Sequence, residues 1–258
     1  MSKRVLALAV VCGASMFGCA EEQRDPGAVN QEIIQNLIVA GFPENDIMVV
    51  DDIVYVGRDA EVSLAASREM LETDGSISDE QYRTSNLVSR SLAVICVNGS
   101  RFTGKFSDAL NRAITNYNNL SLTFRMQRTS GSTSGCNAVI TAFVSGPTGG
   151  SSGFPSGGLP FNRINIGAGM NSFSTDTVEH VITHELGHCV GFRHSDYFNR
   201  SISCGSGGNE GSAGVGAILI PGTPSGATVG GSIMNSCFRS SETGEFTGTD
   251  VTALQTLY

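Results

Sequence analysis

All four histidines of the chain fall between residues 180 and 194, where the sequence at 184–194 reads HELGHCVGFRH. If this stretch begins as a helix, His184 and His188 are four residues apart and their imidazoles project from one face. Gly191 stands where the helix must end, because glycine adopts positive φ at low cost. The turn there would bring His194 back toward the other two imidazoles. Three neutral nitrogen ligands leave one open position on a tetrahedral Zn²⁺, which is typical of a catalytic zinc site.

Glu185 is the acid–base residue that this arrangement predicts. Zinc lowers the pKa of a bound water from about 15.7 to about 7, and Glu185 would accept the proton during attack and pass it to the leaving amine. The metal would meanwhile polarise the scissile carbonyl. His180 lies one turn before His184, and we expect it to lie near the metal or at the surface rather than to bind the metal, because a fourth protein ligand would displace the water. Helical histidines can also be structural, but Gly191 and His194 at these spacings disfavour coincidence.

The histidine string resembles the metzincin consensus, His-Glu-x-x-His-x-x-Gly-x-x-His. Residues 232–235, SIMN, are similar to the metzincin Met-turn, which implies that Met234 forms an apolar floor beneath the zinc; a lone methionine is otherwise ordinary core. Residues 83–258 resemble the bacterial dual-action HEIGH metallopeptidases, also in RHSDYF at 193–198 and PGTP at 221–224. The resemblance implies an α/β (α+β) fold with a mixed twisted sheet, an active-site helix, the Met-turn and a C-terminal helix, preceded by a small pro-segment.

Two departures from relatives of this kind bear on mechanism and latency. Astacins and serralysins have a tyrosine two residues after the Met-turn methionine, whereas this chain has Ser236, so that only a tyrosine from elsewhere, such as Tyr197, could assist. No cysteine lies between residues 20 and 95, which excludes a cysteine switch from that segment. An Asp or Glu of that segment, such as Asp51 or Asp52, could instead bind the metal, as in astacin-like latency; the alternative is that these carboxylates are solvated.

Charge is distributed unevenly along the 258 residues, whose formal net charge of -8 argues against a nucleic-acid binder. Residues 20–82 contain 15 acidic and 3 basic residues, whereas residues 83–258 contain 9 acidic and 11 basic ones. This shift places a boundary near residue 83. The acidic part is either a solvated subdomain or a pro-segment that lies across the catalytic domain.

The first residues predict export. Lys3 and Arg4 precede an apolar run at 5–17, too short for an ordinary membrane span, and no other run approaches the roughly 20 residues that a span needs. The run ends at Cys19 in a stretch that resembles a bacterial lipobox, which would make Cys19 the lipidation site; cleavage after Ala20 is the alternative. We therefore predict an export signal at 1–18, an acidic pro-segment at 19–83 and a catalytic domain at 84–258.

Hydrophobic periodicity indicates an α/β layer in the second part of the chain. We expect strands at 91–98, 120–126, 138–144 and 161–166, and helices at 106–118 and from Asp176, with Glu179 completing a capping box. In the first part we expect a helix at 31–40 and a hairpin at 46–58, and Thr247 and Asp250 predict a cap for a closing helix. Residues 145–158 contain 12 Gly, Ser or Pro and are interpreted as a flexible surface loop.

Cysteine pairing is constrained by export, which permits disulfides. Of the 7 cysteines, Cys12 belongs to the export signal and Cys19 is the possible lipid site, which leaves five in the body of the protein. Connectivity does not follow from sequence. Cys189 and Cys204 form the most local pair, and we expect a disulfide between them.

We expect a zinc-dependent endopeptidase that hydrolyses peptide bonds with a zinc-activated water and Glu185 as general base. By analogy with metzincins, substrate would add to an edge strand within residues 138–158, and residues 217–220 would line the specificity pocket or lie below it. We expect a monomer without nucleic-acid partners, in the bacterial cell envelope or at the surface as a lipoprotein, or else secreted; membrane contact would be through the lipid alone. The alternatives are a surface binding lipoprotein with a structural zinc helix, and a zinc hydrolase of non-peptide substrates. Glu185 disfavours the structural alternative.

Overall fold

The computed structural model describes residues 25–72, 81–211 and 217–258. The predicted export signal and Cys19 lie outside these described residues. Within them, no helix has the length and apolar character to cross a membrane. We call residues 25–72 the N-terminal segment, and residues 81–211 and 217–258, where the sequence predicts the catalytic domain, the catalytic part.

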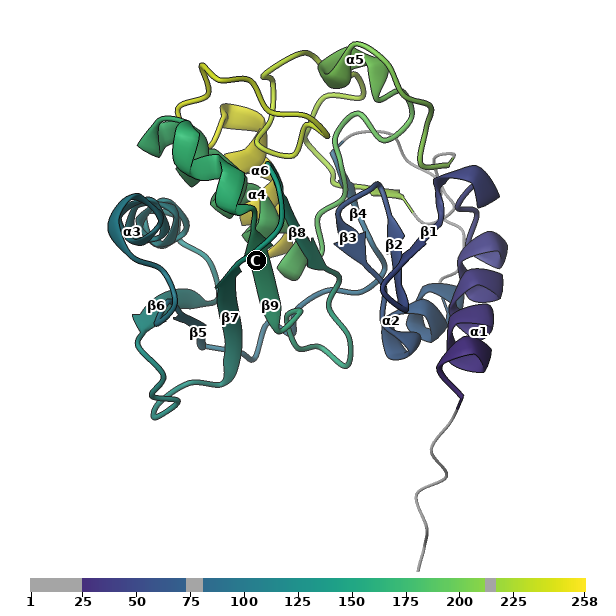
Figure 1. Cartoon of the computed structure of the whole chain (residues 1–258), viewed down its shortest axis with the longest axis horizontal. Helices are drawn as coiled ribbons and strands as arrows, with labels where there is room; N and C mark the ends of the chain where they lie inside the picture. Colours follow the sequence, from purple (N-terminus) through teal and green to yellow (C-terminus); the bar gives the residue numbers. More distant parts are fainter. Residues whose placement is uncertain (1–24, 73–80, 212–216) are drawn as a thin grey trace, which may run out of the picture.

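One eight-stranded sheet runs through both parts, in the order β1-β2-β3-β8-β9-β7-β5-β6 (Figure 1). Its strands are β1 (Met48–Val50), β2 (Ile53–Val56), β3 (Ala60–Glu61), β5 (Val94–Asn98), β6 (Arg125–Thr129), β7 (Ala138–Val144), β8 (Gly150–Gly153) and β9 (Arg163–Ile166). Strands β6, β5, β7 and β9 are parallel, whereas β8 is antiparallel to β9. A small second sheet pairs β4 (Tyr82–Arg83) with β10 (Ile218–Leu219).

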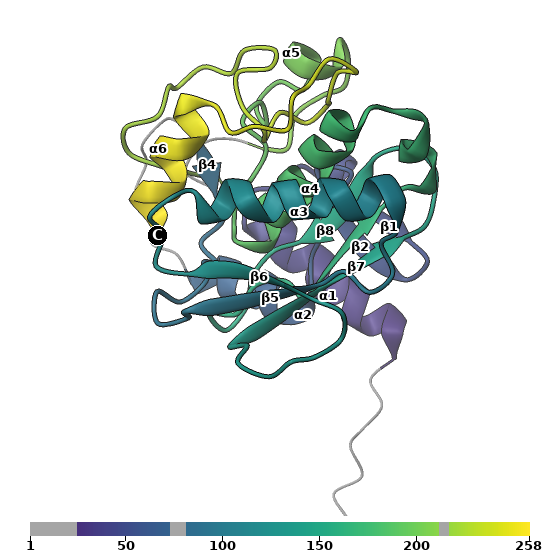
Figure 2. The ribbon, with the colours of Figure 1, turned by 90° about the vertical axis from the view of Figure 1, so that its left-hand side faces the viewer.

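Two long helices cover one face of the sheet in the catalytic part, α3 (Gly104–Asn118) and α4 (Thr175–Cys189) (Figure 2). The predicted apolar face of α3 is buried in the main core, together with buried residues of β5, β7 and β9. Helix α6 (Gly248–Leu257) closes the same core, and its predicted cap is confirmed, because Thr247 and Asp250 form a capping box. The remaining elements are η3 (Ala168–Ser172) and the short α5 (Ser201–Cys204).

The N-terminal segment builds its own small core beside the catalytic part (Figure 1). Its helices are α1 (Pro26–Val39), η1 (Glu44–Asp46), α2 (Leu64–Glu69) and η2 (Met70–Glu72). Helix α1 packs on β2 and on α2, and Phe154 of the catalytic part joins the same core. Strand β3 then pairs in parallel with β8, with Ala60 opposite Ser152 and Glu61 opposite Gly153. The segment thereby extends the catalytic sheet at β8.

Three expectations about local structure are wrong. The strand expected at 120–126 begins only at Arg125 and continues to Thr129 as β6. Residues 145–158 are not simply a surface loop, because β8 lies within them; its glycines and serines pair through backbone groups and need no large side chains. The cap of α4 is Ser174, whose hydroxyl accepts from Thr177 N–H, while Asp176 pairs with Arg112 at 2.7 Å. The helix cap therefore lies two residues before Asp176, the residue predicted to form it.

The predicted disulfide between Cys189 and Cys204 is also wrong. The bonds join Cys96 to Cys136 and Cys204 to Cys237, and among the described cysteines Cys189 is free. Cys189 ends α4 on its core side and is fully buried, whereas Cys204 in α5 faces the segment after the Met-turn. These two cysteines are close in the sequence but are not paired in the structure, because the chain reverses direction between them.

Candidate metal centre

The three predicted histidines converge on one point. Helix α4 presents His184 and His188, and the chain turns at Gly191, with φ of +107°, to return His194. A Cβ at Gly191 would lie 2.6 Å from Asn86 O, so the turn needs glycine for space as well as for conformation. The Nε2 atoms lie 3.0 Å apart for His188–His184 and 3.3 Å apart for the two pairs with His194.

Each of these imidazoles is oriented through its other nitrogen. The Nδ1 of His184 lies 2.8 Å from Ile233 O, and that of His188 lies 2.7 Å from Phe192 O. Because a carbonyl oxygen only accepts, each Nδ1 carries the proton and each Nε2 is left with its lone pair. Burial lowers the pKa of His188 to about 3, so this imidazole stays neutral. Lone pairs this close repel one another unless a cation lies among them, and the donor set fits a metal ion.

A carboxylate from the N-terminal segment completes the cluster. Asp59 Oδ2 lies 3.1 Å from His194 Nε2 and 3.6 Å from His184 Nε2, and Asp59 Oδ1 lies 3.6 Å from His188 Nε2. These four residues offer ligand atoms within 4.8 Å of one another. Asp59 Oδ1 is buried without a hydrogen-bond partner, as expected of an atom that faces a metal position. Although burial opposes ionisation of Asp59, the three neighbouring imidazoles, His194 first among them, lower the pKa of this carboxyl group.

The N-terminal segment does place a carboxylate at the cluster, but neither of the two residues named from the sequence, Asp51 and Asp52, reaches it. Both are exposed in the turn between β1 and β2, with φ of +49° and +61°, conformations that aspartate tolerates better than most residues. The carboxylate at the cluster comes instead from the next turn, between β2 and β3, because the pairing of β3 with β8 places that turn over the histidines.

Glu185 lies beside the histidines with its carboxyl group buried against β8. Ser152 donates a hydrogen bond of 2.7 Å to Glu185 Oε2. Burial raises the pKa of Glu185 well above its ordinary value, and the Asp59 carboxylate adds to the rise. A Cβ at Gly150 would lie 2.8 Å from Glu185 Cγ, so only glycine leaves room for this side chain.

The Met-turn lies directly beneath α4. A Cβ at Gly187 would lie 2.6 Å from Met234 Sδ, so the methionine packs against the helix where it has no side chain. Met234 O accepts from Ser195 N at 2.8 Å, which joins the turn to the residue after His194. Asp250 supports the turn from α6 by accepting from Ser232 Oγ at 2.6 Å.

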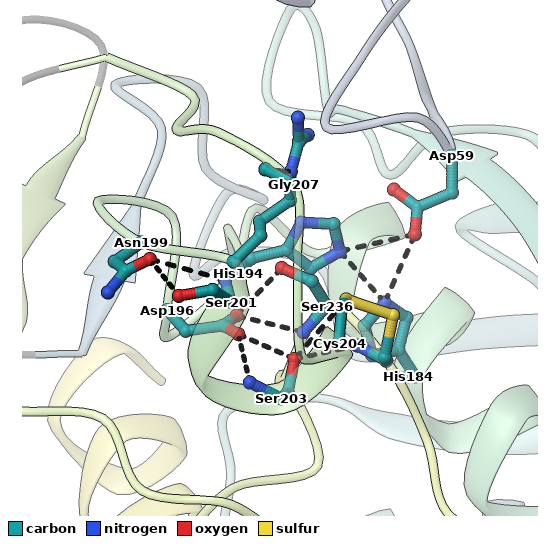
Figure 3. The surroundings of a disulfide bond; sticks show 12 residues. Asp59, His184, His194, Asp196, Asn199, Ser201, Ser203, Cys204, Gly207 and Ser236 are labelled. Carbon is teal, nitrogen blue, oxygen red and sulfur yellow. Dashed lines mark hydrogen bonds and ion pairs between the residues drawn. A yellow bond between two sulfur atoms is a disulfide. The ribbon is translucent and has the colours of Figure 1, made fainter.

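Beyond the Met-turn, the buried side chain of Asp196 links α5 to the segment after the Met-turn through hydrogen bonds (Figure 3). It accepts from the backbone and hydroxyl groups of Ser236, at 2.9 and 2.7 Å, and from the hydroxyl of Ser203. The Cys204–Cys237 disulfide reinforces the same connection. Ser236 therefore has a structural role at the position where astacin-like enzymes have a tyrosine. Tyr197, the other tyrosine considered from the sequence, is buried against the ring of Tyr82.

A cavity of about 280 Å³ opens beside the cluster. It is lined on one side by His184, Glu185 and Gly150, and on the other by Ser236 and residues of the Met-turn region. Arg58 and Asp59 of the N-terminal segment also line it. His180 borders it without joining the cluster, and burial lowers the pKa of this imidazole to about 4. Residues 217–220 do not line it; Ala217 and Ile220 are fully buried below.

Sequence reasoning missed Glu210. Its Oε1 lies 2.6 Å from His194 Nδ1, so a carboxylate orients this imidazole where carbonyl groups orient the other two. Although burial would raise the pKa of Glu210, the charges of His194 and Arg193 outweigh it and lower the pKa to about 2. Glu210 lies in a glycine-rich stretch with no periodicity, so nothing in its surroundings marked it.

Three convergent imidazoles, a buried glutamate and an adjoining cavity define a metal-dependent hydrolase. Residues 54–258 match the dual-action HEIGH metallopeptidase family, and the chain belongs to that family. It is therefore a metallopeptidase, and imidazole and carboxylate donors of this kind fit zinc as its cofactor. The match begins at residue 54 and so includes Asp59 as well as the histidines.

Comparison with solved structures finds weak likeness to zinc peptidases. A structure of myroilysin is 15% identical to this chain, with a TM-score of 0.42, and the matched region covers 67% of this chain and 95% of the myroilysin chain. The high choriolytic enzyme 1, a hatching enzyme zinc-protease from the medaka Oryzias latipes, is 17% identical, with a TM-score of 0.40, and covers 67% and 92%. These values carry no substrate or partner information to this chain. A search of curated protein sequences finds no match.

Proposed function

We propose that the protein is an exported zinc endopeptidase in which His184, His188 and His194 hold the metal and Glu185 transfers the proton. The observation that carries this proposal is the convergence of three Nε2 atoms beside a buried carboxyl group. Zinc, when bound, polarises a peptide carbonyl and acidifies water. Met234 would fix the position of α4 from below.

Glu185 is suited to accept a proton and to return it. A carboxyl group whose pKa is raised by burial holds a proton closer to neutral pH than an exposed one. The hydrogen bond from Ser152 holds one of its oxygens, which orients the other. Glu185 would take the proton from the attacking water and deliver it to the leaving amine.

Substrate would bind along β8, in the place that β3 occupies. Without the N-terminal segment, β8 would be paired on one side through β9 alone and could accept an extended peptide. An antiparallel peptide forms the more stable pairing, and its side chains would reach the adjoining cavity. The parallel direction of β3 is thus opposite to that of the substrate.

The N-terminal segment would keep the enzyme latent until it is removed. Two contacts support this role: β3 covers the backbone of β8, and Asp59 faces the metal position that substrate and water need. Division into an export signal at 1–18, a pro-segment at 19–83 and a catalytic domain at 84–258 remains our proposal. So does lipidation of Cys19 in a bacterial envelope, with simple secretion as the alternative. The two disulfides favour export, because such bonds persist in oxidising compartments.

Exchange of Glu185→Gln tests the peptidase chemistry. We expect hydrolysis of a peptide library to fall by a factor of about 10² to 10⁴, since only acid–base transfer is removed, while bound zinc stays unchanged. Glu242→Gln is the matched control, because Glu242 lies 4.0 Å from His180 and outside the metal cluster. Cleavage that survives in Glu185→Gln would reject the mechanism. Zinc binding without any peptide cleavage, both in the parent protein and after removal of the N-terminal segment, would favour a binding lipoprotein instead.

Exchange of Asp59→Asn tests latency. The amide has no charge to offer the metal, so we expect the full-length variant to cleave peptides about tenfold faster than the parent or more, in proportion to the lost metal contact. Asp51→Asn is the control, since Asp51 is exposed in the neighbouring turn. Equal rates for parent and Asp59→Asn would remove Asp59 from the latency proposal.

A further inference from the structure

Among the three imidazoles, His194 alone is oriented by a charged side chain. Glu210 is 2% exposed, and its Oε1 lies 2.6 Å from His194 Nδ1. A carboxylate makes the imidazole a more basic ligand than a carbonyl does, and such partners fix its tautomer and its ring orientation. The strength with which His194 binds the metal therefore depends on the charge that Glu210 presents.

Two buried arginines set that charge. Arg193 Nη2 lies 3.2 Å from Glu210 Oε2 and also donates to Glu210 O at 3.0 Å. Arg200 Nη1 lies 3.7 Å from Glu210 Oε1, the oxygen that accepts from His194. The same Nη1 lies only 2.6 Å from Asp46 Oδ1. Arg200 is thus shared between Glu210 and the N-terminal segment, and in this structure Asp46 holds it more closely.

The N-terminal segment is fitted tightly around this arrangement. Asp46 Oδ2 accepts from Gly57 N at 2.9 Å, which ties it to the turn that carries Asp59. A Cβ at Gly57 would lie 3.1 Å from both Glu210 Oε2 and His194 Cε1, so the backbone of this turn packs directly against the Glu210 and His194 side chains. The ring of Phe42 lies 4.2 Å from the guanidinium of Arg193.

We propose that Glu210 is the positioning residue of His194, and that the chain of contacts Asp46–Arg200–Glu210–His194 links docking of the N-terminal segment to metal binding. When Asp46 is withdrawn, Arg200 loses its closest partner and moves to Glu210 Oε1. The carboxylate then divides its charge between Arg200 and His194, and its hydrogen bond to Nδ1 weakens. The second half of this proposal rests on the proposed covering role of the segment.

Variants of Glu210 in the full-length protein test the positioning role. We expect the zinc dissociation constant, from competition with a chelator, to rise about 10- to 100-fold in Glu210→Ala and less in Glu210→Gln, whose amide oxygen still accepts the N–H but carries no charge. In the nitrogen-15 imidazole spectrum of the zinc-loaded protein, His194 should shift while His184 and His188 stay in place. A merely structural role would not move His194 alone.

Glu242→Gln serves as the control and should keep the zinc affinity and the His184, His188 and His194 resonances of the parent protein; only His180, which Glu242 faces, should shift. Glu210→Gln has the shape of the original residue, so it decides the outcome if Glu210→Ala does not fold. A folded Glu210→Gln protein with the parent zinc affinity and an unmoved His194 resonance would overturn the positioning role.

Asp46→Asn tests the link to the N-terminal segment. We expect it to shift the His194 resonance and to raise the zinc dissociation constant by a factor of about two to ten, although Asp46 touches no metal ligand. Glu32→Gln is the matched control, because Glu32 pairs with Arg68 inside the same segment, at 2.6 Å, and is exposed. Asp46→Asn with the parent spectrum and affinity would overturn the link.

The activity of Asp59→Asn separates this link from latency. If that variant is no more active than the parent while Asp46→Asn moves His194, the link stands and the covering role fails. If Asp59→Asn is activated while Asp46→Asn leaves His194 unmoved, latency stands and the link is rejected.

Discussion

The catalytic part folds around a large apolar core beneath α3 and α4 and carries both disulfides, whereas the N-terminal segment has a small core and no cysteine. The two parts meet through the β3–β8 pairing, the Phe154 contact and charged contacts near the metal centre. The Asp46–Arg200 pair is buried, and such a pair adds little net stability, because desolvation of the two charges offsets their attraction. We therefore expect the N-terminal segment, which has the smaller core, to be the less stable of the two parts.

The net charge follows the same division. The acidic excess lies in the first part of the chain, and two of its carboxylates, on Asp46 and Asp59, reach the buried side chains of Arg200 and His194 in the catalytic part. Part of the acidic charge that composition alone would place on a solvated surface therefore lies at the contact between the two parts. Independent changes in the two parts should accordingly have different effects on stability and on activity.

The largest difference is expected from one substitution made in each core. Leu37 in α1 and Leu110 in α3 are both fully buried, and Leu→Ala at such sites costs about 2–5 kcal/mol. We expect Leu37→Ala to loosen the N-terminal segment and to raise the peptidase activity of the full-length protein. Leu110→Ala should lower the melting temperature of the catalytic part without raising activity. Calorimetry and a peptide assay on both variants measure these effects, and identical behaviour would show that the two parts unfold as one unit.

Removal of the metal comes next in size. A ligand at a hundredfold excess over its dissociation constant stabilises the folded state by about 2.7 kcal/mol, which corresponds to about 5–10 °C for a chain of this size. We expect a chelator to lower the melting temperature by that amount and added zinc to restore it. Because Asp59 contacts the metal position from the N-terminal segment, Asp59→Asn should reduce the shift while Asp51→Asn should not. An unchanged melting temperature after metal removal would contradict a shared metal centre.

The smallest effect is expected at Arg58, which precedes Asp59. Its φ of +80° is one that a residue with a Cβ adopts at a cost of about 1–2 kcal/mol, and Gly57 before it also has positive φ. Arg58→Gly should relieve part of this cost, stabilise the turn by up to about 1 kcal/mol and make the full-length protein slower to activate. Arg58→Ala is the control, since it removes the side chain and keeps the Cβ. Denaturant unfolding and the lag before activity rises would measure the difference.

The metal ligands could be predicted from sequence because the geometry of one helix and one turn fixes them. His184, His188 and His194 need only the helical period and the freedom of Gly191. Helix α3 and the cap of α6 followed from equally local patterns. These features depend on neighbours within a few residues, and a single sequence contains that information.

The remaining site residues depend on pairing between distant segments. Asp59 replaces the predicted Asp51 or Asp52 only because β3 pairs with β8, almost a hundred residues later in the chain. Glu210 reaches His194 through a glycine-rich loop that has no period to read. The partner of Cys204 is likewise set by where the chain returns after the Met-turn. Strand β8 escaped prediction because its pairing uses the backbone alone, beside the space that Glu185 occupies.

The parallel direction of β3 bears on how the enzyme would mature. The chain at β3 runs parallel to β8, whereas a substrate would run antiparallel to it. A peptide bond of the N-terminal segment is therefore presented to Glu185 in the reverse direction, and the molecule is not expected to cut its own segment in place. Removal then requires an encounter with another protease molecule, and self-activation of a pure sample would be second order in protein concentration. If the N-terminal segment keeps the enzyme latent as proposed, diluted molecules would remain latent for long periods, whereas molecules that the proposed lipid anchor holds on one membrane surface would activate one another.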